Sequence, residues 1–106
     1  MPAYPPSATS WSVIVVGVSA PGTAEQVASH VVPEGMEIGV TARRSNSGNC
    51  YIADSQTNAQ TAGSRKVLVP SQSTVLRLDN TNKIWMDADS ANERIEIVVQ
   101  KIPSTT

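Results

Sequence analysis

The chain has 106 residues and a formal net charge of −1, from 8 basic and 9 acidic residues, and it lacks Phe, so we expect one domain with an aliphatic core. This charge balance gives no long-range attraction for nucleic acid or an anionic membrane, and we expect neither as a partner. The single cysteine excludes an intrachain disulfide, and no segment resembles a signal peptide or a membrane span. Synthesis and assembly in a reducing cytoplasm fit this composition.

The first ten residues contain three prolines and few residues that a core could bury. They predict an extended, polyproline-like arm. Two interpretations stay open: a disordered terminus, or an arm that lies on a neighbouring subunit and contacts it through Tyr4, Pro5 and Pro6. We divide the chain into this arm (1–10), a β-sandwich domain (11–102) and a short tail (103–106).

Four elements are expected in the first half of the domain. The β-branched run 11–18, which begins with Trp11, indicates a strand that is buried on both faces or lies at a subunit contact. A short strand over 25–28 precedes a tight turn at 32–35, where proline presets φ and glycine accepts a positive φ. Residues 36–43 alternate between apolar and polar, which predicts a half-buried strand with Glu37 on the solvent face.

The second half predicts further short strands separated by polar turns. We expect strands at 50–53, 66–69, 74–78, 84–88 and 94–102, and a long exposed loop over the polar residues 54–64. The two basic pairs, 43–44 and 65–66, are expected to be solvated. Seven or eight short strands with regular turn signals indicate an all-β fold, an antiparallel β-sandwich or jelly roll.

No set of residues in the sequence suits catalysis. His30 is the only histidine and has no serine-elbow motif beside it, so we expect an ordinary surface histidine. Cys50 lies inside a predicted strand and is expected to be buried and inert. The best metal ligands, Asp87, Asp89 and Glu93, lack the central glycine of a calcium loop, and we expect a solvated turn. The sequence therefore predicts no enzyme, no metal and no cofactor.

Trp85 is a candidate binding residue of the predicted domain. It alternates with Ile84 and Met86 and is in phase with Asp87. Two interpretations stay open: a core or inter-sheet tryptophan, or an exposed ring available to a ligand or a neighbouring subunit. Together with Trp11 and the arm residues, Trp85 completes our set of candidate partner contacts.

Two linked motifs carry a resemblance to a known group of proteins. The first is Asn-Ser-Gly-Asn-Cys-Tyr-Ile at residues 46–52, and the second is Leu-Arg-Leu-Asp-Asn at 76–80, which leads into Lys-Ile-Trp at 83–85. With their neighbours they resemble small accessory proteins of tailed-phage virions. The matching segments, which lie within 25–102, are Gln26, 32–35, 36–42, 46–52, 68–70, 76–80, 83–85 and 95–99.

The resemblance implies a β-sandwich virion protein without catalytic residues. Such a protein decorates the capsid shell or forms a head fibre or spike. We expect a capsid decoration protein on the outer shell, bound to the major capsid protein as a homo-oligomer, with a trimer as the first stoichiometry to consider. The alternative is a receptor- or glycan-binding head on a fibre or tail.

Overall fold

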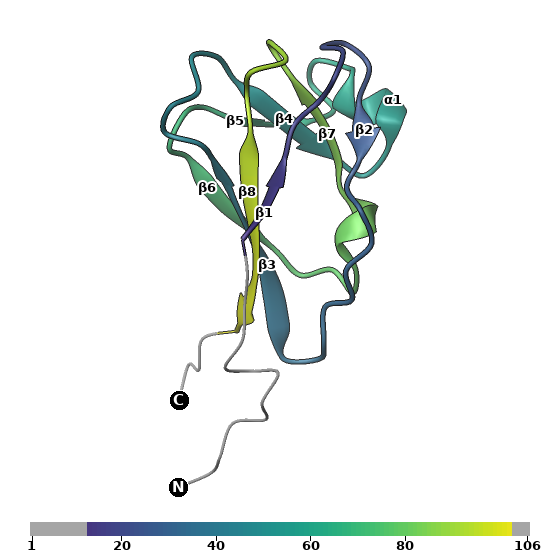
Figure 1. The fold of residues 1–106 in the computed structure, drawn as a ribbon. Helices are drawn as coiled ribbons and strands as arrows, with labels where there is room; N and C mark the ends of the chain where they lie inside the picture. Colours follow the sequence, from purple (N-terminus) through teal and green to yellow (C-terminus); the bar gives the residue numbers. More distant parts are fainter. Residues whose placement is uncertain (1–12, 103–106) are drawn as a thin grey trace, which may run out of the picture.

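The structure is a computed structural model that describes residues 13–102. Its strands form two antiparallel sheets of four strands each (Figure 1). The first sheet has the order β1 (Ile14–Val16), β8 (Ile95–Lys101), β3 (Met36–Ala42) and β6 (Ser73–Leu76). The second sheet has the order β2 (Glu25–Gln26), β7 (Trp85–Ala88), β4 (Cys50–Ala53) and β5 (Lys66–Leu68).

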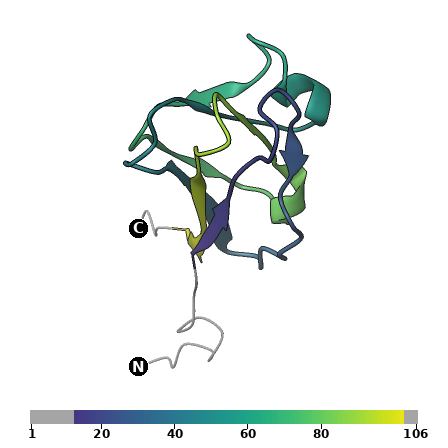
Figure 2. The ribbon, with the colours of Figure 1, turned by 45° about the horizontal axis from the view of Figure 1, so that its top comes forward.

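This strand order is that of a jelly roll: successive strands alternate between the two sheets, except β4 and β5, which pair with each other in the second sheet. The turned view shows the sheets as two layers, with the β1–β2 and β7–β8 connections crossing from one layer to the other at one end (Figure 2). The predicted fold class, an all-β antiparallel sandwich or jelly roll, is confirmed. Within residues 13–102, no helix has the length and apolarity needed to cross a membrane.

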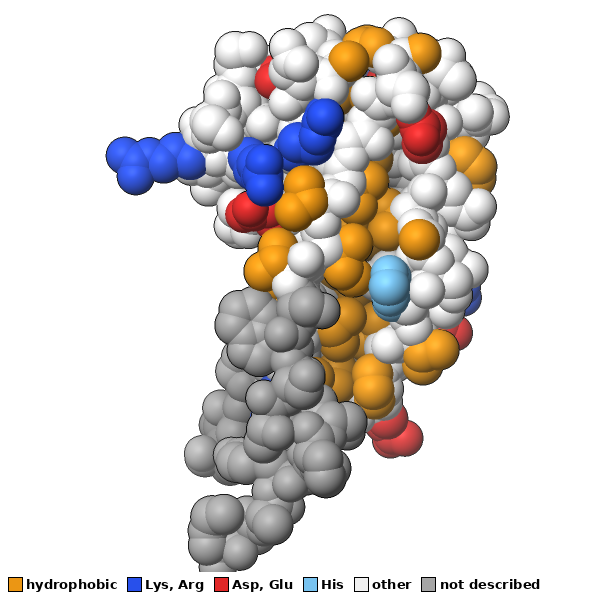
Figure 3. All heavy atoms as spheres, viewed as in Figure 1, with side chains coloured by type: hydrophobic (Ala, Val, Ile, Leu, Met, Phe, Trp, Pro, Cys, Tyr) orange, Lys and Arg blue, Asp and Glu red, His pale blue; other side chains and the backbone are white. Residues whose placement is uncertain are grey.

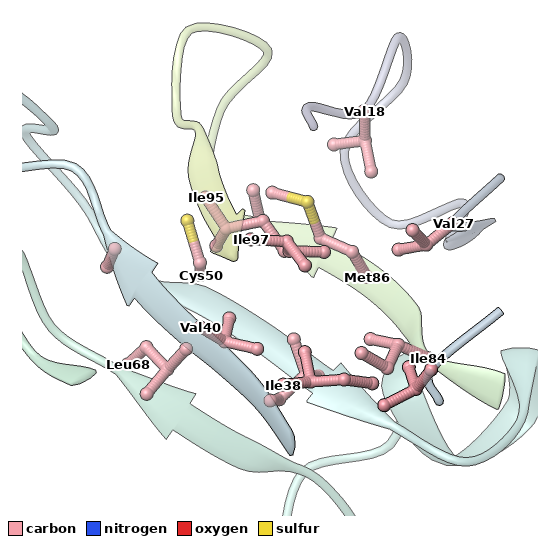
Figure 4. Packing of buried hydrophobic residues seen from close by; sticks show 14 residues of the cluster. Val18, Val27, Ile38, Val40, Cys50, Leu68, Ile84, Met86, Ile95 and Ile97 are labelled. Carbon is pink, nitrogen blue, oxygen red and sulfur yellow. The ribbon is translucent and has the colours of Figure 1, made fainter. Parts of the chain in front are cut away.

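The core lies between the sheets and is aliphatic (Figure 4). The first sheet buries Ile38, Val40, Ile95 and Ile97, and each of them is fully shielded from solvent. β3 and β8 bring them together, because Val40 pairs with Ile97 in the ladder that joins these two strands. From the second layer, residues that include Leu68, Ile84 and Met86 pack against them. The alternation predicted for β3 thus places Ile38, Val40 and Ala42 in the core.

The tight turn at 32–35 forms as predicted. Gly35 adopts φ 86°, and the Met36 amide donates to the Pro33 carbonyl at 3.0 Å. The polar turn between β6 and β7 contains a 3-10 helix, η2 (Thr81–Lys83). The side chain of its N-cap residue, Asn80, accepts a hydrogen bond from the Asn82 amide at 2.9 Å.

Glu37 is buried, and its predicted place on the solvent face is wrong: the residue is 3% exposed. The carboxylate accepts a hydrogen bond from the Gln100 amide at 2.9 Å and forms an ion pair with Arg77 at 3.6 Å. Gly39 leaves the space for this arrangement, since a Cβ there would lie 3.1 Å from the Gln100 amide oxygen. The side chains that cover the Glu37 charge come from outside β3. The alternation within β3 therefore did not predict that this residue is buried.

The segment 54–64 is only partly the exposed loop that we expected. It contains a short helix, α1 (Gln56–Ala59), in which Ala59 is completely buried and the Ser55 hydroxyl caps the Asn58 amide. Gln56 donates to the Ala24 carbonyl at 3.0 Å, and the Gln60 side chain accepts from the Ala24 amide at 2.7 Å. The glutamine side chains thus satisfy backbone groups beside β2, which holds a polar segment against the domain.

β1 is shorter than the predicted strand 11–18, and residues 11 and 12 lie outside the described part. The ladder with β8 ends where Val16 pairs with Ile95. At Gly17 the Arg94 side chain approaches the backbone so closely that a Cβ would lie 2.5 Å from its guanidinium. A larger residue at position 17 would require the Arg94 side chain to move away from the end of β1.

Candidate functional site

A cavity of about 520 Å³ lies at one end of the second sheet, and Trp85 is one of the residues that line it. Its apolar surface comes from Ile52, Leu76, Leu78 and Ile84, which belong to both layers of the sandwich. Its polar groups belong to Gln26, Asp54, Lys66, Asn82 and Lys83. An apolar cavity of this size with a few polar groups has the general character of a small-ligand site.

Three strands position Trp85 beside this cavity. Trp85 is the first residue of β7 and pairs with Gln26 of β2 on one side and Ala53 of β4 on the other. The Gln26 amide donates to the Asn82 carbonyl at 2.7 Å, which ties β2 to η2 next to the ring. The Trp85 side chain is half-buried at this position. Such a ring offers an apolar face to a stacking ligand.

Of the candidate contacts from the sequence, the structure describes only Trp85. It is neither a core residue nor fully exposed; it is half-buried in the wall of the cavity. Tyr4, Pro5, Pro6 and Trp11 lie outside the described residues.

Residues of the motif at 46–52 form hydrogen bonds between the loop that precedes β4 and the loop that joins β7 to β8. Asn46 donates to the Arg94 carbonyl at 2.8 Å and accepts from the Arg94 amide at 3.0 Å. Asp89 accepts from the Asn49 amide at 2.8 Å and from the Tyr51 hydroxyl. The Tyr51 hydrogen bond is the main cause that lowers the pKa of Asp89 and raises that of Tyr51. These bonds account for the asparagines and the tyrosine as structural residues.

Asp87 and Glu93 are buried, at 3% and 1% exposed, so the predicted solvated turn is wrong for both residues. Asp87 accepts from the Gly22 amide at 2.9 Å, which holds the β1–β2 connection, and from its neighbouring Ala88 amide at 2.8 Å. Arg65 lies 4.0 Å from the Asp87 carboxylate.

Arg65 is also not the solvated residue that we expected, because its guanidinium lies 3.5 Å from the centre of the Tyr51 ring. Its side chain further donates to the Ala59 carbonyl at 3.1 Å, which ties α1 to the residue that precedes β5. The predicted basic pair 65–66 therefore splits, since Lys66 is exposed.

Glu93 has an unusual environment. One carboxylate oxygen accepts from the Ser47 amide at 3.1 Å, and the other, Oε2, is buried and has no hydrogen-bond partner among residues 13–102. Oε2 and the Asp89 oxygen Oδ2 lie 2.5 and 3.1 Å from the position that a Cβ of Gly48 would occupy. Within the described part of the chain, no group of three His, Cys, Asp or Glu residues is placed to hold a metal ion.

Cys50 and His30 have the environments expected of structural residues. Cys50 is completely buried, and burial together with the Glu93 and Asp89 carboxylates raises the pKa of its thiol to about 11. The thiolate, which is the reactive form, is therefore disfavoured. His30 is exposed, and its amide donates to Asn80 and Thr81.

Apolar surface remains at the edges of both sheets. Val13 and Val15 are 43% and 45% exposed at β1, and Val75 is 51% exposed at β6, the opposite edge of the same sheet. Val67 is 43% exposed at β5, an edge of the second sheet. Figure 3 shows hydrophobic side chains gathered over β1 and in a band that continues beside it toward His30. Exposed apolar groups that form such a patch are typical of surfaces that bind other macromolecules.

Comparison of the chain with protein-family models, with curated proteins and with solved structures finds no match.

Proposed function

We propose that this protein is a structural component of a tailed-phage virion, a decoration (cementing) protein that binds the major capsid protein on the outer shell as a homo-oligomer. Two lines of support are the sequence motifs at 46–52 and 76–85 and the jelly-roll strand order. Jelly rolls occur in viral capsid and lectin domains. One fold supports many functions, so a binding function depends on the residues at the surface of the domain.

The observation that carries the proposal is the presence of exposed valines at opposite edges of one small domain. Val15 lies at β1 and Val75 at β6, the two ends of the first sheet. A cementing protein has to contact at least two neighbours, and apolar groups at opposite edges allow that geometry. Binding to the assembled shell and not to its separated subunits stabilises the shell by mass action.

Cryo-electron microscopy of undecorated phage capsids mixed with the purified protein tests this proposal. We expect density at regular sites on the icosahedral shell. Density confined to the tail, or its absence from the shell, would contradict the decoration role.

Surface variants connect this test to the residues. Val75→Lys should reduce shell occupancy, because it places a charge on one of the two exposed apolar edges. Ala62→Lys, at an exposed turn outside both edges, is the matched control and should leave occupancy unchanged.

The N-terminal arm is part of the proposal. Deletion of residues 1–10, which include Tyr4, Pro5 and Pro6, should lower occupancy of the shell while residues 11–106 still fold. Unchanged occupancy would remove the arm from the proposed contact. The trimer, which is the first stoichiometry to consider, stays a prediction that the mass of the particle in solution tests.

The Trp85 cavity favours a second candidate function, a glycan- or receptor-binding head. An indole beside several polar side chains can stack against a sugar ring and bond to its hydroxyl groups. Trp85→Ala should then abolish glycan binding without loss of folding, whereas Val31→Ala, an exposed residue outside the cavity, should preserve it. A broad glycan panel without a single binder would exclude this function.

A further inference from the structure

The four strands that end the two sheets differ in how their edges are protected. Proteins commonly discourage pairing at such edges with charged residues or proline. β2 carries Glu25 and β5 carries Lys66, while β6 is bracketed by Pro70 and Arg77. β1 has neither protection: residues 13–18 read Val-Ile-Val-Val-Gly-Val.

β1 is also exposed at its side chains. Within residues 13–102 its backbone pairs with β8 alone, so one side of the strand has no neighbouring strand. Val13 and Val15 are 43% and 45% exposed, and Ile14 and Val16 pack only partly buried against the core. The band of hydrophobic side chains in Figure 3 runs along this same edge. An unprotected strand edge and an apolar surface therefore coincide.

We propose that two copies of this chain pair through β1, antiparallel and centred on Val15. In this arrangement the two-fold axis places Val15 opposite Val15 and Ile14 opposite Val16. The pairing joins the two β1-containing sheets into one continuous sheet. It does not depend on the proposed virion function, and it predicts an assembly different from the trimer.

The partner that we expect at the free edge of β1 is a second copy of the chain, because the residues of β1 are uncharged. Across a two-fold axis each residue near the centre faces itself or its near neighbour, so a charged residue would meet a like charge. Self-pairing of β2 would bring together two copies of Glu25, and self-pairing of β5 two copies of Lys66. β1 brings together only valine and isoleucine, which are uncharged and have a high preference for strands.

Light scattering coupled to size-exclusion chromatography tests the proposal on the full chain and two matched variants. Val15→Lys places a charge at the centre of the proposed pair, and Val67→Lys places one at the edge of β5, where the valine is 43% exposed. We expect the wild type and Val67→Lys at twice the 11.2 kDa of one chain, and Val15→Lys at 11.2 kDa. Circular dichroism and thermal unfolding confirm that both variants fold.

Other masses overturn the proposal. A wild-type mass of one chain excludes the pair, and if deletion of residues 1–10 then produces a two-chain particle, the chain's own arm is what covers β1. A mass of three chains excludes the pair and supports the trimer. Equal loss of association in Val15→Lys and Val67→Lys would show that an added charge at either position weakens association. The loss in Val15→Lys would then give no evidence for pairing through β1.

Cross-linking tests the register. Directly opposed residues in antiparallel strands have Cα atoms about 4.5–5.5 Å apart, which lies within the roughly 4.4–6.8 Å that a disulfide spans. Val15→Cys should therefore form a two-chain band under oxidation that a reductant removes, and Val67→Cys should not. The buried Cys50 thiol does not compete. A dimeric Val15→Cys protein without this band would exclude pairing centred on Val15.

Discussion

Replacing Glu93 with Gln should stabilise the fold, because Glu93 is the least satisfied buried group among the described residues. Its Oε1 atom accepts from the Ser47 amide, while Oε2 is buried without a partner and lies near the Asp89 carboxylate. Glutamine keeps an oxygen for the Ser47 amide. It removes one of two neighbouring negative charges and supplies an N–H group that can donate toward Asp89.

The magnitude follows from three effects. A buried polar group without a partner costs about 1–3 kcal/mol, and Gln relieves this cost. Loss of charge weakens the Ser47 hydrogen bond by about 1 kcal/mol, since bonds to charged groups are the stronger ones. Relief of repulsion from Asp89 adds little, because Asp89 is exposed and solvent screens its charge. We therefore expect a net gain of about 1 kcal/mol, or a rise of about 4–8 °C in Tm for a domain of this size.

Chemical denaturation at neutral pH measures this change, with Glu96→Gln as the matched control. Glu96 pairs with Arg43 at 3.2 Å, but both side chains are about 40% exposed, at 38% and 41%. Loss of such a surface pair should cost no more than about 0.5–1 kcal/mol. The two substitutions are chemically identical and differ in burial, so opposite signs of the effect are expected.

A loss of 1 kcal/mol or more in Glu93→Gln would refute this reasoning. It would show that the Glu93 charge is stabilised in the folded protein by a group that the carboxylate contacts and the amide cannot. A loss accompanied by a lower denaturant slope would instead indicate a change in the compactness of one of the two states.

Three further predictions concern the core and the titrating groups. Leu68→Ala should cost about 2–5 kcal/mol in denaturation experiments, because Leu68 is fully buried, whereas Val67→Ala should change stability by no more than about 0.5 kcal/mol. Because the pKa of Cys50 rises from 9.0 to about 11 on folding, stability present below pH 9 should fall between pH 9 and 11, and Cys50→Ala should lack this part of the decline. The lowered pKa of Asp89 stabilises the fold above its ordinary pKa of 3.8, and this contribution is lost as pH falls further; acid titration of Tyr51→Phe should show a smaller loss.

Features that depend on residues adjacent in the sequence were predictable from the sequence. The alternation in β3 follows from the period of two in a strand, and the turn at Pro33 and Gly35 follows from their own φ preferences. The order of apolar runs and polar turns was enough to indicate an all-β sandwich. For the candidate site, Trp85 was identified, but its half-buried place in a cavity depends on Gln26 and Ala53, its partners from two other strands.

The tertiary structure decided which polar residues are buried and which apolar residues are exposed. Glu37, Asp87 and Glu93 look like surface carboxylates in the sequence, yet backbone amides and side chains from distant segments cover them. The exposure of Val15 likewise follows from the place of β1 at the end of its sheet. Strand periodicity is a local property that each segment carries, whereas burial and edge position are set by segments that meet only when the chain folds.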